Sequence, residues 1–338
     1  MIRLNCDYLE GCHPAILRKL TETNMEQTVG YGMDPYCDQA AAMLRETFAC
    51  PEAAVHFLVG GTQANTTVIA AALRPYEGVL CAETGHINVH ETGAIESSGH
   101  KCLALPHRNG KITAEQVAAA VAAQGNDEHI VKPGMVYISL STELGTLYTL
   151  SELQAMYRTC QQLGLYLFID GARLGYALAA EGNDLSLKEL AALADVFYIG
   201  GTKVGALFGE AVVVRDPKRL PHLFPLVKQH GALLAKGRLL GLQFEALFTN
   251  GLYEKIGQKA VAQALRIREA FRAKGYEVVV PSPTNQQFFR LPNEVIDRLK
   301  QEASFELWGP RGATETVVRF VTGWSTTDED VDQLIAML

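Results

Sequence analysis

The middle of the chain alternates short apolar runs with helical patterns, and this alternation constrains the fold more than any other feature of the sequence. The segment 165–169 is almost wholly apolar, which is typical of a strand buried on both faces of a sheet. Strands that alternate with helices favour a mostly parallel sheet covered by helices on both faces. The expected strands are residues 55–58, 78–82, 101–105, 135–140, 165–170, 195–199 and 211–215, and the expected helices are 63–73, 113–123 and 151–163, with Thr113 and Ser151 as N-caps.

The pattern changes after Pro217, which fits the first turn of a helical segment. From there to about residue 274 the pattern is helical, and beyond it strands alternate with helices in a different order. The second part is expected to contain strands at 276–280, 286–291 and 316–322 and helices at 293–303 and 328–338. We therefore expect an α/β protein with an N-terminal arm (1–30), a large domain with a mostly parallel sheet sandwiched by helices (31–249) and a small α+β C-terminal domain (250–338), in line with about 150 residues per domain for 338 residues.

Composition excludes several classes of protein. The formal net charge is −7, with 37 acidic and 30 basic residues, so the basic stripe of a nucleic-acid binder is not expected. No run of about 18 apolar residues predicts a membrane-spanning helix, and Asp7 lies where a signal peptide would need its apolar stretch. Seven scattered cysteines with no C-x-x-C pair favour reduced thiols and a cytoplasmic location.

Two glycines followed by a threonine, Gly60-Gly61-Thr62, come directly after an expected strand and open an expected helix. Glycines there let the backbone approach a ligand, and the free N–H groups of a helix start favour an anion. The alternative is an ordinary tight turn between a strand and a helix. The segment matches neither the dinucleotide-binding nor the P-loop pattern.

A carboxylate and an amine follow two other apolar strands. Asp170 ends its strand where open α/β sheets place ligands, although it could also cap the helix that follows. Lys203 comes after an apolar strand and two glycines; most lysines are solvated, but a desolvated one is a nucleophile that forms Schiff bases. An anion site, a strand-end aspartate and a strand-end lysine, in this order, are what pyridoxal phosphate needs for its phosphate, its ring nitrogen and its aldehyde.

Further candidates lie outside these strands. His86 and His90 share a face if they lie on a helix, and with Glu91 nearby they could hold zinc, but no third ligand is placed by local spacing and we expect no metal site. We expect His86 to stack on the cofactor ring, and His90 and Glu91 to have structural or hydrogen-bonding roles. Arg319 lies in an apolar strand and faces either solvent or the cleft between domains, where a guanidinium would match a substrate carboxylate.

Motifs along essentially the whole chain resemble those of one family. They are Tyr31-Gly32-Met33-Asp34-Pro35, Gly61-Thr62 with Asn65, Gly85-His86 with Glu91-Thr92-Gly93-Ala94, Asp170-Gly171-Ala172-Arg173, Thr202-Lys203 and Arg319-Phe320-Val321-Thr322. In these the chain resembles the threonine aldolase family, within the β-eliminating lyases of the aspartate aminotransferase fold. It departs from the family at Asn5-Cys6-Asp7, where Arg-Ser-Asp is common, at Gly60, where serine is frequent, and around Lys203.

The resemblance implies a role for each matching residue. Lys203 would carry the cofactor, next to Thr202, Asp170 would bond the ring nitrogen, and His86 would stack on the ring. The phosphate would be bound by Gly61 and Thr62, and by Lys236 of a neighbouring subunit. Arg173 would contact the ring oxygen and, with Arg319, the substrate carboxylate, near Cys6 in place of the family's serine. Family members are dimers or tetramers with shared active sites.

The implied activity is that of a pyridoxal-phosphate-dependent aldehyde-lyase, which cleaves a threonine-like β-hydroxy-α-amino acid into glycine and an aldehyde. His86, or a water molecule that it holds, is the candidate base for the β-hydroxyl proton. Other reactions of the same cofactor, β-elimination or transamination, remain alternatives. So do a non-catalytic scaffold of the same fold and a zinc hydrolase built on His86 and His90.

Overall fold

The computed structural model describes residues 1–125 and 127–338, and its largest element is a seven-stranded sheet. The strand order is β2-β8-β7-β6-β5-β3-β4. These strands are β2 (Ala54–Leu58), β3 (Glu77–Ala82), β4 (Cys102–Leu105), β5 (Lys132–Ser139), β6 (Tyr166–Asp170), β7 (Val196–Gly200) and β8 (Glu210–Val214). Strands β4, β3, β5, β6 and β7 are parallel, whereas β8 runs antiparallel to both β7 and β2. The mostly parallel sheet is confirmed, and each of its strands overlaps a predicted one.

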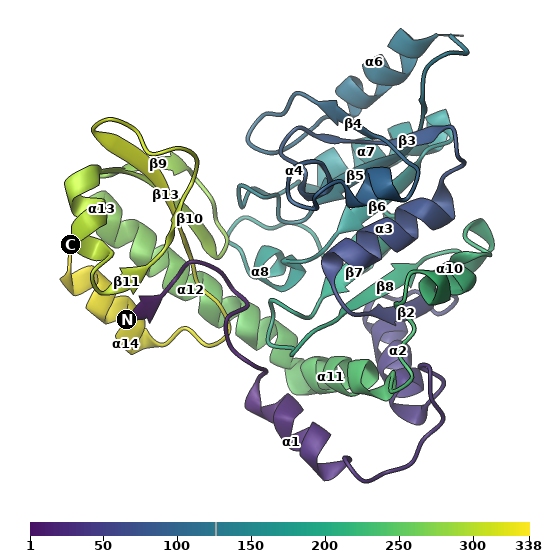
Figure 1. Cartoon of the computed structure of the whole chain (residues 1–338), viewed down its shortest axis with the longest axis horizontal. Helices are drawn as coiled ribbons and strands as arrows, with labels where there is room; N and C mark the ends of the chain where they lie inside the picture. The colour runs from purple at the N-terminus through teal and green to yellow at the C-terminus, as the bar shows by residue number, and fades with distance from the viewer. Residues whose placement is uncertain (126) are drawn as a thin grey trace.

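Helices cover both faces of this sheet, and the strand periodicity explains why (Figure 1). Successive side chains point to opposite faces, so Leu167 and Ile169 of β6 join one hydrophobic cluster and Phe168 the other. The first cluster includes apolar residues of α2 (Pro35–Thr47), α7 (Leu150–Leu163) and α11 (Arg238–Phe248), and the second those of α3 (Gly61–Ala72) and α10 (Leu223–Gln229).

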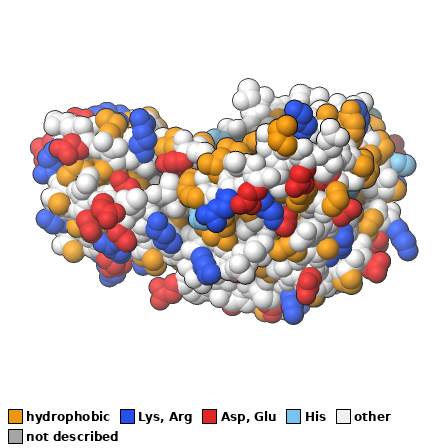
Figure 2. Space-filling model, turned by 90° about the horizontal axis from the view of Figure 1, so that it is seen from below, with side chains coloured by type: hydrophobic (Ala, Val, Ile, Leu, Met, Phe, Trp, Pro, Cys, Tyr) orange, Lys and Arg blue, Asp and Glu red, His pale blue; other side chains and the backbone are white. Residues whose placement is uncertain are grey.

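A smaller antiparallel sheet forms the second lobe, in the order β12-β13-β10-β9. Its strands are β9 (Glu277–Val280), β10 (Gln286–Pro292), β12 (Glu306–Leu307) and β13 (Glu315–Val321), and the helices of this lobe are α13 (Asn293–Leu299) and α14 (Asp328–Ala336). Its core is rich in phenylalanine, with Phe271 and Phe289 stacked at 4.3 Å between ring centroids. The long helix α12 (Leu252–Ala273) runs from the large part into this lobe (Figure 1), and the two lobes are separated by an indentation in the surface (Figure 2).

The N-terminus belongs spatially to the small lobe. Strand β1 (Ile2–Arg3) pairs in parallel with β11 (Ala303–Ser304), so the start of the chain lies beside residues near its end (Figure 1). The chain then crosses to the large part, where α1 (Pro14–Glu22) packs against α11. The fold class is confirmed, whereas the exact division into residues 1–30, 31–249 and 250–338 stays a prediction.

Several local predictions need correction. Helix α7 is capped by Thr149 and not by Ser151, because Glu152 completes a capping box with the hydroxyl three residues before it. The Thr113 cap of α6 (Ala114–Gln124) is confirmed, with Gln116 as its partner. The helical stretch from Pro217 to residue 274 is divided into a 3₁₀ turn, η1 (Pro217–Arg219), then α10, α11, η2 (Thr249–Gly251) and α12.

Short helices make up the remaining elements. They are α4 (His86–Val89), α5 (Ala94–Ser97), α8 (Leu174–Leu178) and α9 (Leu187–Ala192). None of the helices in residues 1–125 and 127–338 has both the length and the hydropathy that a bilayer crossing requires. All seven cysteines are free thiols.

Candidate active site

One cavity, of about 310 Å³, lies where three strands of the large sheet end. Asp170 is the last residue of β6, the Gly60–Thr62 segment follows β2, and Thr202 and Lys203 follow β7. The residues predicted to bind the cofactor within the same subunit all line it, namely Gly61, Thr62, His86, Asp170, Arg173, Thr202 and Lys203. The structure therefore brings together residues that are as far apart in the chain as 61 and 203.

The start of α3 forms one wall of this cavity. Gly60 is its N-cap, and no side chain there bonds the first N–H groups of the helix. A methyl group on Gly60 would meet no atom within 4 Å, so open space lies beside the backbone at this point. The N–H groups of the first helical turn have no partner inside a helix, and with the helix dipole they favour an anion.

Asp170 is buried and held by several hydrogen bonds. Its Oδ2 accepts from the Tyr137 hydroxyl at 2.5 Å and from Asn65 Nδ2 at 3.4 Å, and its Oδ1 accepts from the Ala172 N–H at 2.9 Å. Burial raises the pKa of this carboxyl, but the attraction of His86 and the hydrogen bonds outweigh burial and leave the pKa below its ordinary value. Asp170 is therefore an anion in the interior, as a partner of a protonated ring nitrogen must be.

His86 is tied to Asp170 through two intermediate residues. Its Nδ1 lies 2.7 Å from Glu91 Oε1, which also accepts from Asn65 Nδ2 at 2.7 Å. Asn65 in turn donates to Asp170. Since a carboxylate only accepts, Nδ1 carries a proton toward Glu91 and Nε2 is left for the cavity. The predicted hydrogen-bonding role of Glu91 is found, and His90 packs beside His86 with 5.5 Å between ring centroids.

Lys203 presents a buried amine to the same cavity. Burial lowers the pKa of its ammonium group and repulsion from Arg173 lowers it further, against the attraction of Asp7, Asp170 and Glu210. A lysine of lowered pKa is neutral more often near pH 7 and is then a nucleophile. Tyr8 lies over the amine, with 6.0 Å from Nζ to the ring centroid.

A second cavity, of about 330 Å³, adjoins the first and shares Tyr8, His86, Glu143, Arg173 and Lys203 with it. The side chains that line only the second one are His90, Glu306, Trp308 and Arg319. Because three of these belong to the small lobe, this cavity lies between the lobes. Arg319 thus faces the cleft and not open solvent, with only 10 % of its side chain exposed.

The two arginines are held differently. Arg173 makes a two-point contact with Asp7, from Nε to Oδ2 at 2.8 Å and from Nη2 to Oδ1 at 3.0 Å. Arg319 donates hydrogen bonds to Gln286, at 3.0 Å, and to Glu306. Its guanidinium carbon lies over the Trp308 ring, 4.7 Å from the ring centroid. Its Nε is buried without an acceptor among the described residues, and an unpaired donor of this kind suits an incoming carboxylate.

Two predicted residues are not brought to these cavities. Cys6 is buried and is not among the residues that line either cavity, whereas Tyr8, two positions further on, lines both. Lys236 lies just before α11 and is likewise not among the lining residues of its own chain. Their proposed contacts with substrate and with a neighbouring phosphate stay predictions.

Sequence reasoning missed several residues of the site, Tyr8 among them. Asp7 was visible as the acid of Asn5-Cys6-Asp7, but nothing local pairs it with Arg173. Tyr137 lies inside β5 and Glu210 begins β8, and their polar atoms meet the site only after the strands pair. Glu143 accepts hydrogen bonds from Ser139 Oγ at 2.6 Å and from the His86 N–H at 3.0 Å, across 57 residues of chain.

The chemical groups of this cavity match those that pyridoxal phosphate needs. The cavity combines an uncapped helix start, an ionised buried carboxylate and an amine of lowered pKa. They do not fit a metal ion in the same way, since no three His, Cys, Asp or Glu side chains within the described residues are arranged to hold one.

Comparisons with known proteins agree on one family. Residues 4–292 match the beta-eliminating lyase family. The chain is 31 % identical to a low specificity L-threonine aldolase of Pseudomonas sp. (strain NCIMB 10558), over 98 % of this chain and 95 % of that protein.

Solved structures extend the likeness to three dimensions. A threonine aldolase of Leishmania major superimposes with a TM-score of 0.97 at 40 % identity, covering 99 % of this chain and 98 % of the other. An aspartate aminotransferase variant of Thermus thermophilus shares the fold alone, with a TM-score of 0.74 at 14 % identity over 100 % of this chain and 90 % of the other. The chain belongs to the beta-eliminating lyase family.

Proposed function

We propose that this protein is a pyridoxal-phosphate-dependent lyase that cleaves a threonine-like β-hydroxy-α-amino acid into glycine and an aldehyde. The observation that carries the proposal is the junction of two cavities. The inner cavity, of about 310 Å³, holds Lys203, Asp170 and the start of α3. The outer cavity, of about 330 Å³, adds Arg319 beside Arg173. The named relatives, a low specificity L-threonine aldolase and a threonine aldolase, support the same substrate class.

The inner cavity holds the cofactor. Pyridoxal phosphate supplies an aldehyde for the amine of Lys203 and a protonated ring that accepts the electrons of a breaking Cα–Cβ bond. Asp170, kept ionised by its hydrogen bonds, holds the proton on the ring nitrogen. Gly61 and Thr62 offer N–H groups and a hydroxyl to the phosphate, and His86 provides a flat ring on the cavity wall.

The outer cavity binds and orients the substrate. Arg319 meets the α-carboxylate with its free Nε, and Arg173, fixed by Asp7, meets it from the large domain. Two guanidinium groups on opposite lobes define the position of Cα, so the Cα–Cβ bond is directed toward alignment with the cofactor's π system. Orientation of this kind lowers the barrier without any chemistry by the arginines themselves.

His86 handles the proton of the β-hydroxyl group. Glu91 fixes the ring and its tautomer, which leaves Nε2 as the acceptor, either directly or through a water molecule. Loss of that proton accompanies departure of the aldehyde. Cα must take up a proton before glycine leaves, and Lys203, whose burial lowers the pKa of its amine, would then hold the cofactor again.

The test combines spectroscopy with product analysis. Purified protein should show the visible absorbance of a lysine-bound cofactor, bleached by borohydride with the label on Lys203, and it should convert threonine into acetaldehyde and glycine. Lys203→Ala should lose both properties. A colourless protein that takes up no pyridoxal phosphate would refute the cofactor, and retained full turnover of Lys203→Ala would refute the role of the lysine. Ammonia and a keto acid as products would instead indicate β-elimination.

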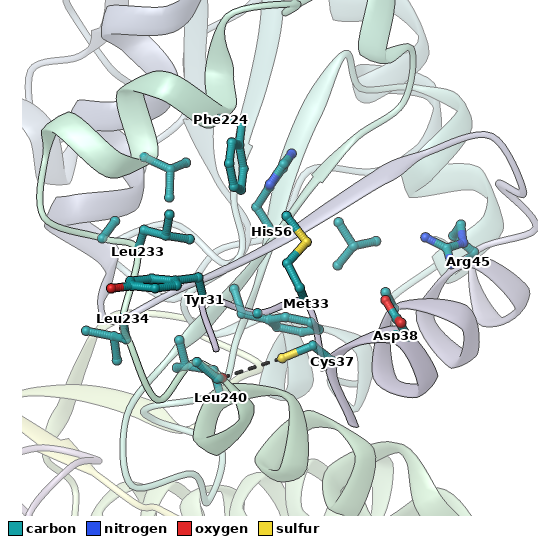
Figure 3. A pocket seen from close by; sticks show the side chains of 17 residues that line it. Tyr31, Met33, Cys37, Asp38, Arg45, His56, Phe224, Leu233, Leu234 and Leu240 are labelled. Carbon is teal, nitrogen blue, oxygen red and sulfur yellow. Dashed lines mark hydrogen bonds between the residues drawn. The ribbon is translucent and has the colours of Figure 1, made fainter. Parts of the chain in front are cut away.

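We propose that the protein assembles as a homodimer or homotetramer, which a largely apolar hollow on the large part supports. The hollow encloses about 250 Å³ between Tyr31, Met33, Phe224 and Leu233 (Figure 3). Tyr31 and Met33 are 47 % and 57 % exposed, and exposed apolar side chains around a hollow are typical of a protein contact. The expected occupant is a second copy of this chain.

Light scattering tests the assembly. The mass in solution should be that of two or four chains, and Met33→Asp should lower it. A mass of one chain at micromolar concentration would refute the proposal.

The cytoplasm is the proposed location. Its support is the set of seven free thiols, several of them buried, which an oxidising compartment would not favour. Fractionation of cells with an antibody to the chain tests it.

A further inference from the structure

Glu210 is a buried acid that the mechanism above does not use. It is only 4 % exposed and begins β8, the strand that runs antiparallel to both of its neighbours. In the sheet it lies opposite Leu58 on one side and Gly200 on the other. These two positions immediately precede the segments that carry the phosphate loop and the lysine, so Glu210 stands between the two.

Hydrogen bonds hold the side chain at this point of the inner cavity. Glu210 Oε2 accepts from the Gly201 N–H at 3.1 Å. Thr202 Oγ1 accepts from the Gly209 N–H at 3.0 Å, and the Thr202 side chain lowers the pKa of the Glu210 carboxyl. Glu210 lines the cavity together with Gly60, Gly61 and Thr62, the residues proposed to receive the phosphate.

The groups that face Glu210 determine its charge. Lys203 and Asp170 lie on neighbouring strand ends, Tyr198 on β7 and Tyr253 on α12, and residues 58–62 contribute no ionisable side chain. Burial raises the pKa of the carboxyl to about 8, because the attraction of Lys203 and the hydrogen bonds offset burial only in part. A phosphate dianion arriving in the same cavity would repel an ionised carboxylate and favour the neutral acid further.

When its carboxyl is neutral, Glu210 attracts the phosphate and no longer repels it. As a carboxylate it would oppose the phosphate, but as an acid it is an O–H donor, and a hydrogen bond from it to a phosphate oxygen is charge-assisted. We propose that Glu210 is a further cofactor-binding residue, which holds the phosphate of pyridoxal phosphate as a neutral acid that donates its proton to a phosphate oxygen. This inference rests on the proposed function, because it requires the cofactor.

The consequence is a loss of phosphate affinity at high pH. Above pH 8 the free protein must take up a proton on Glu210 in order to bind the phosphate, so the affinity should fall about tenfold for each further pH unit. Pyridoxal, which lacks the phosphate, should not show this loss. The ratio of the two affinities therefore removes the contribution of Lys203, whose protonation affects both compounds alike.

The experiment measures the dissociation constants of pyridoxal phosphate and pyridoxal for the cofactor-free protein, by absorbance, between pH 6.5 and 9.5. In the wild type the preference for the phosphorylated compound should fall above pH 8. In Glu210→Gln, which donates a hydrogen bond but cannot ionise, the preference should stay constant. Glu210→Ser, also unable to ionise, serves as a second variant if Gln disturbs folding.

The possible results distinguish the proposed role of Glu210 from the proposed lyase function. A wild-type preference that stays constant with pH, or a Glu210→Gln variant that keeps the wild-type decline, would overturn the role of Glu210 and leave the lyase function standing. Absence of pyridoxal phosphate binding at every pH would overturn both.

Discussion

The Asp7 carboxylate and the guanidinium of Arg173, which lines the inner cavity, lie 166 residues apart in the chain and form a two-point contact with distances of 2.8 and 3.0 Å. Burial raises the pKa of the Asp7 carboxyl, but the positive charge of Arg173 lowers it. The net result is a pKa below the ordinary value. Asn285 of the small lobe donates to the same carboxylate at 2.9 Å. Asp7 therefore connects both lobes to the arginine that we propose to meet the substrate.

Asp7→Asn should weaken both the fold and substrate binding. The substitution leaves a buried guanidinium without its counter-ion, which costs about 3–5 kcal/mol in comparable buried pairs. Arg173 also loses its fixed orientation, so the KM for threonine should rise about tenfold while kcat falls less. Urea unfolding and steady-state kinetics measure the two effects.

A matched control is available on the surface. Asp328 pairs with Arg266 at 2.8 Å, but 72 % of its side chain is exposed. Exposed pairs are screened by solvent, so Asp328→Asn should leave both unfolding and KM near wild type. Equal losses in the two variants would show that Asp7 has no special role.

His86→Asn should lower kcat about 100-fold, the usual contribution of a positioned base. The asparagine keeps a polar side chain but lacks a basic ring nitrogen at the Nε2 position. Binding of pyridoxal phosphate should weaken, because the flat ring of His86 is lost from the cavity wall, but it should persist, because Lys203 and the helix start remain. Single-turnover rates with threonine, beside an absorbance titration of the cofactor, separate the two properties.

His129, which is exposed and is not among the lining residues of either cavity, provides the control for that substitution. Turnover by His129→Asn should match the wild type. If His86→Asn retained the full single-turnover rate, the β-hydroxyl proton would have to leave by another group.

The sequence was sufficient for the strand-end residues and insufficient for those that reach the site through pairing. Asp170 could be predicted because an acid that ends an apolar strand has few structural reasons to be there. Glu210 also borders an apolar strand, but its position beside the lysine follows from the antiparallel course of β8, which no local pattern encodes. The role of Asp7 could not be predicted, because it depends on the packing of the N-terminus against the small lobe, a contact across most of the chain.

Local signals failed where two similar residues competed. Thr149 and Ser151 both carry hydroxyls near the start of α7, and only the spacing to Glu152 distinguishes the cap. The end of α13 was placed too late, at residue 303, because β11 pairs with β1 there and ends the helix at Leu299. Tertiary pairing decided this boundary.

Gly241→Ala should destabilise the large domain. A methyl group at this position of α11 would lie 2.6 Å from the backbone of Cys37 in α2, and a backbone atom cannot move aside cheaply. Overpacking of this kind costs about 1–3 kcal/mol. At Gly11 the nearest atom would be 3.9 Å away, so Gly11→Ala is the control. Thermal melting should separate the two variants, and equal melting temperatures would contradict the close approach of α2 and α11.

The buried acid Glu210 should make the stability of the cofactor-free protein depend on pH. Its pKa is 4.5 in an unfolded chain and about 8 in the fold, so unfolding releases a proton throughout this interval. The unfolded state then binds fewer protons than the folded state, and stability falls as pH rises. The loss of stability caused by Glu210 is absent below pH 4.5, grows by at most about 1.4 kcal/mol per pH unit, and stops growing above pH 8.

Glu210→Gln removes this dependence, because glutamine does not titrate. Relative to the wild type the variant should therefore gain stability steadily between pH 5.5 and 7.5, as measured by urea unfolding of both cofactor-free proteins in the same buffers. The difference between the two proteins cancels the titration of every shared group that does not face Glu210. Parallel pH profiles would mean that Glu210 is already ionised in the fold, and with it the neutral acid proposed to bind the phosphate would be lost.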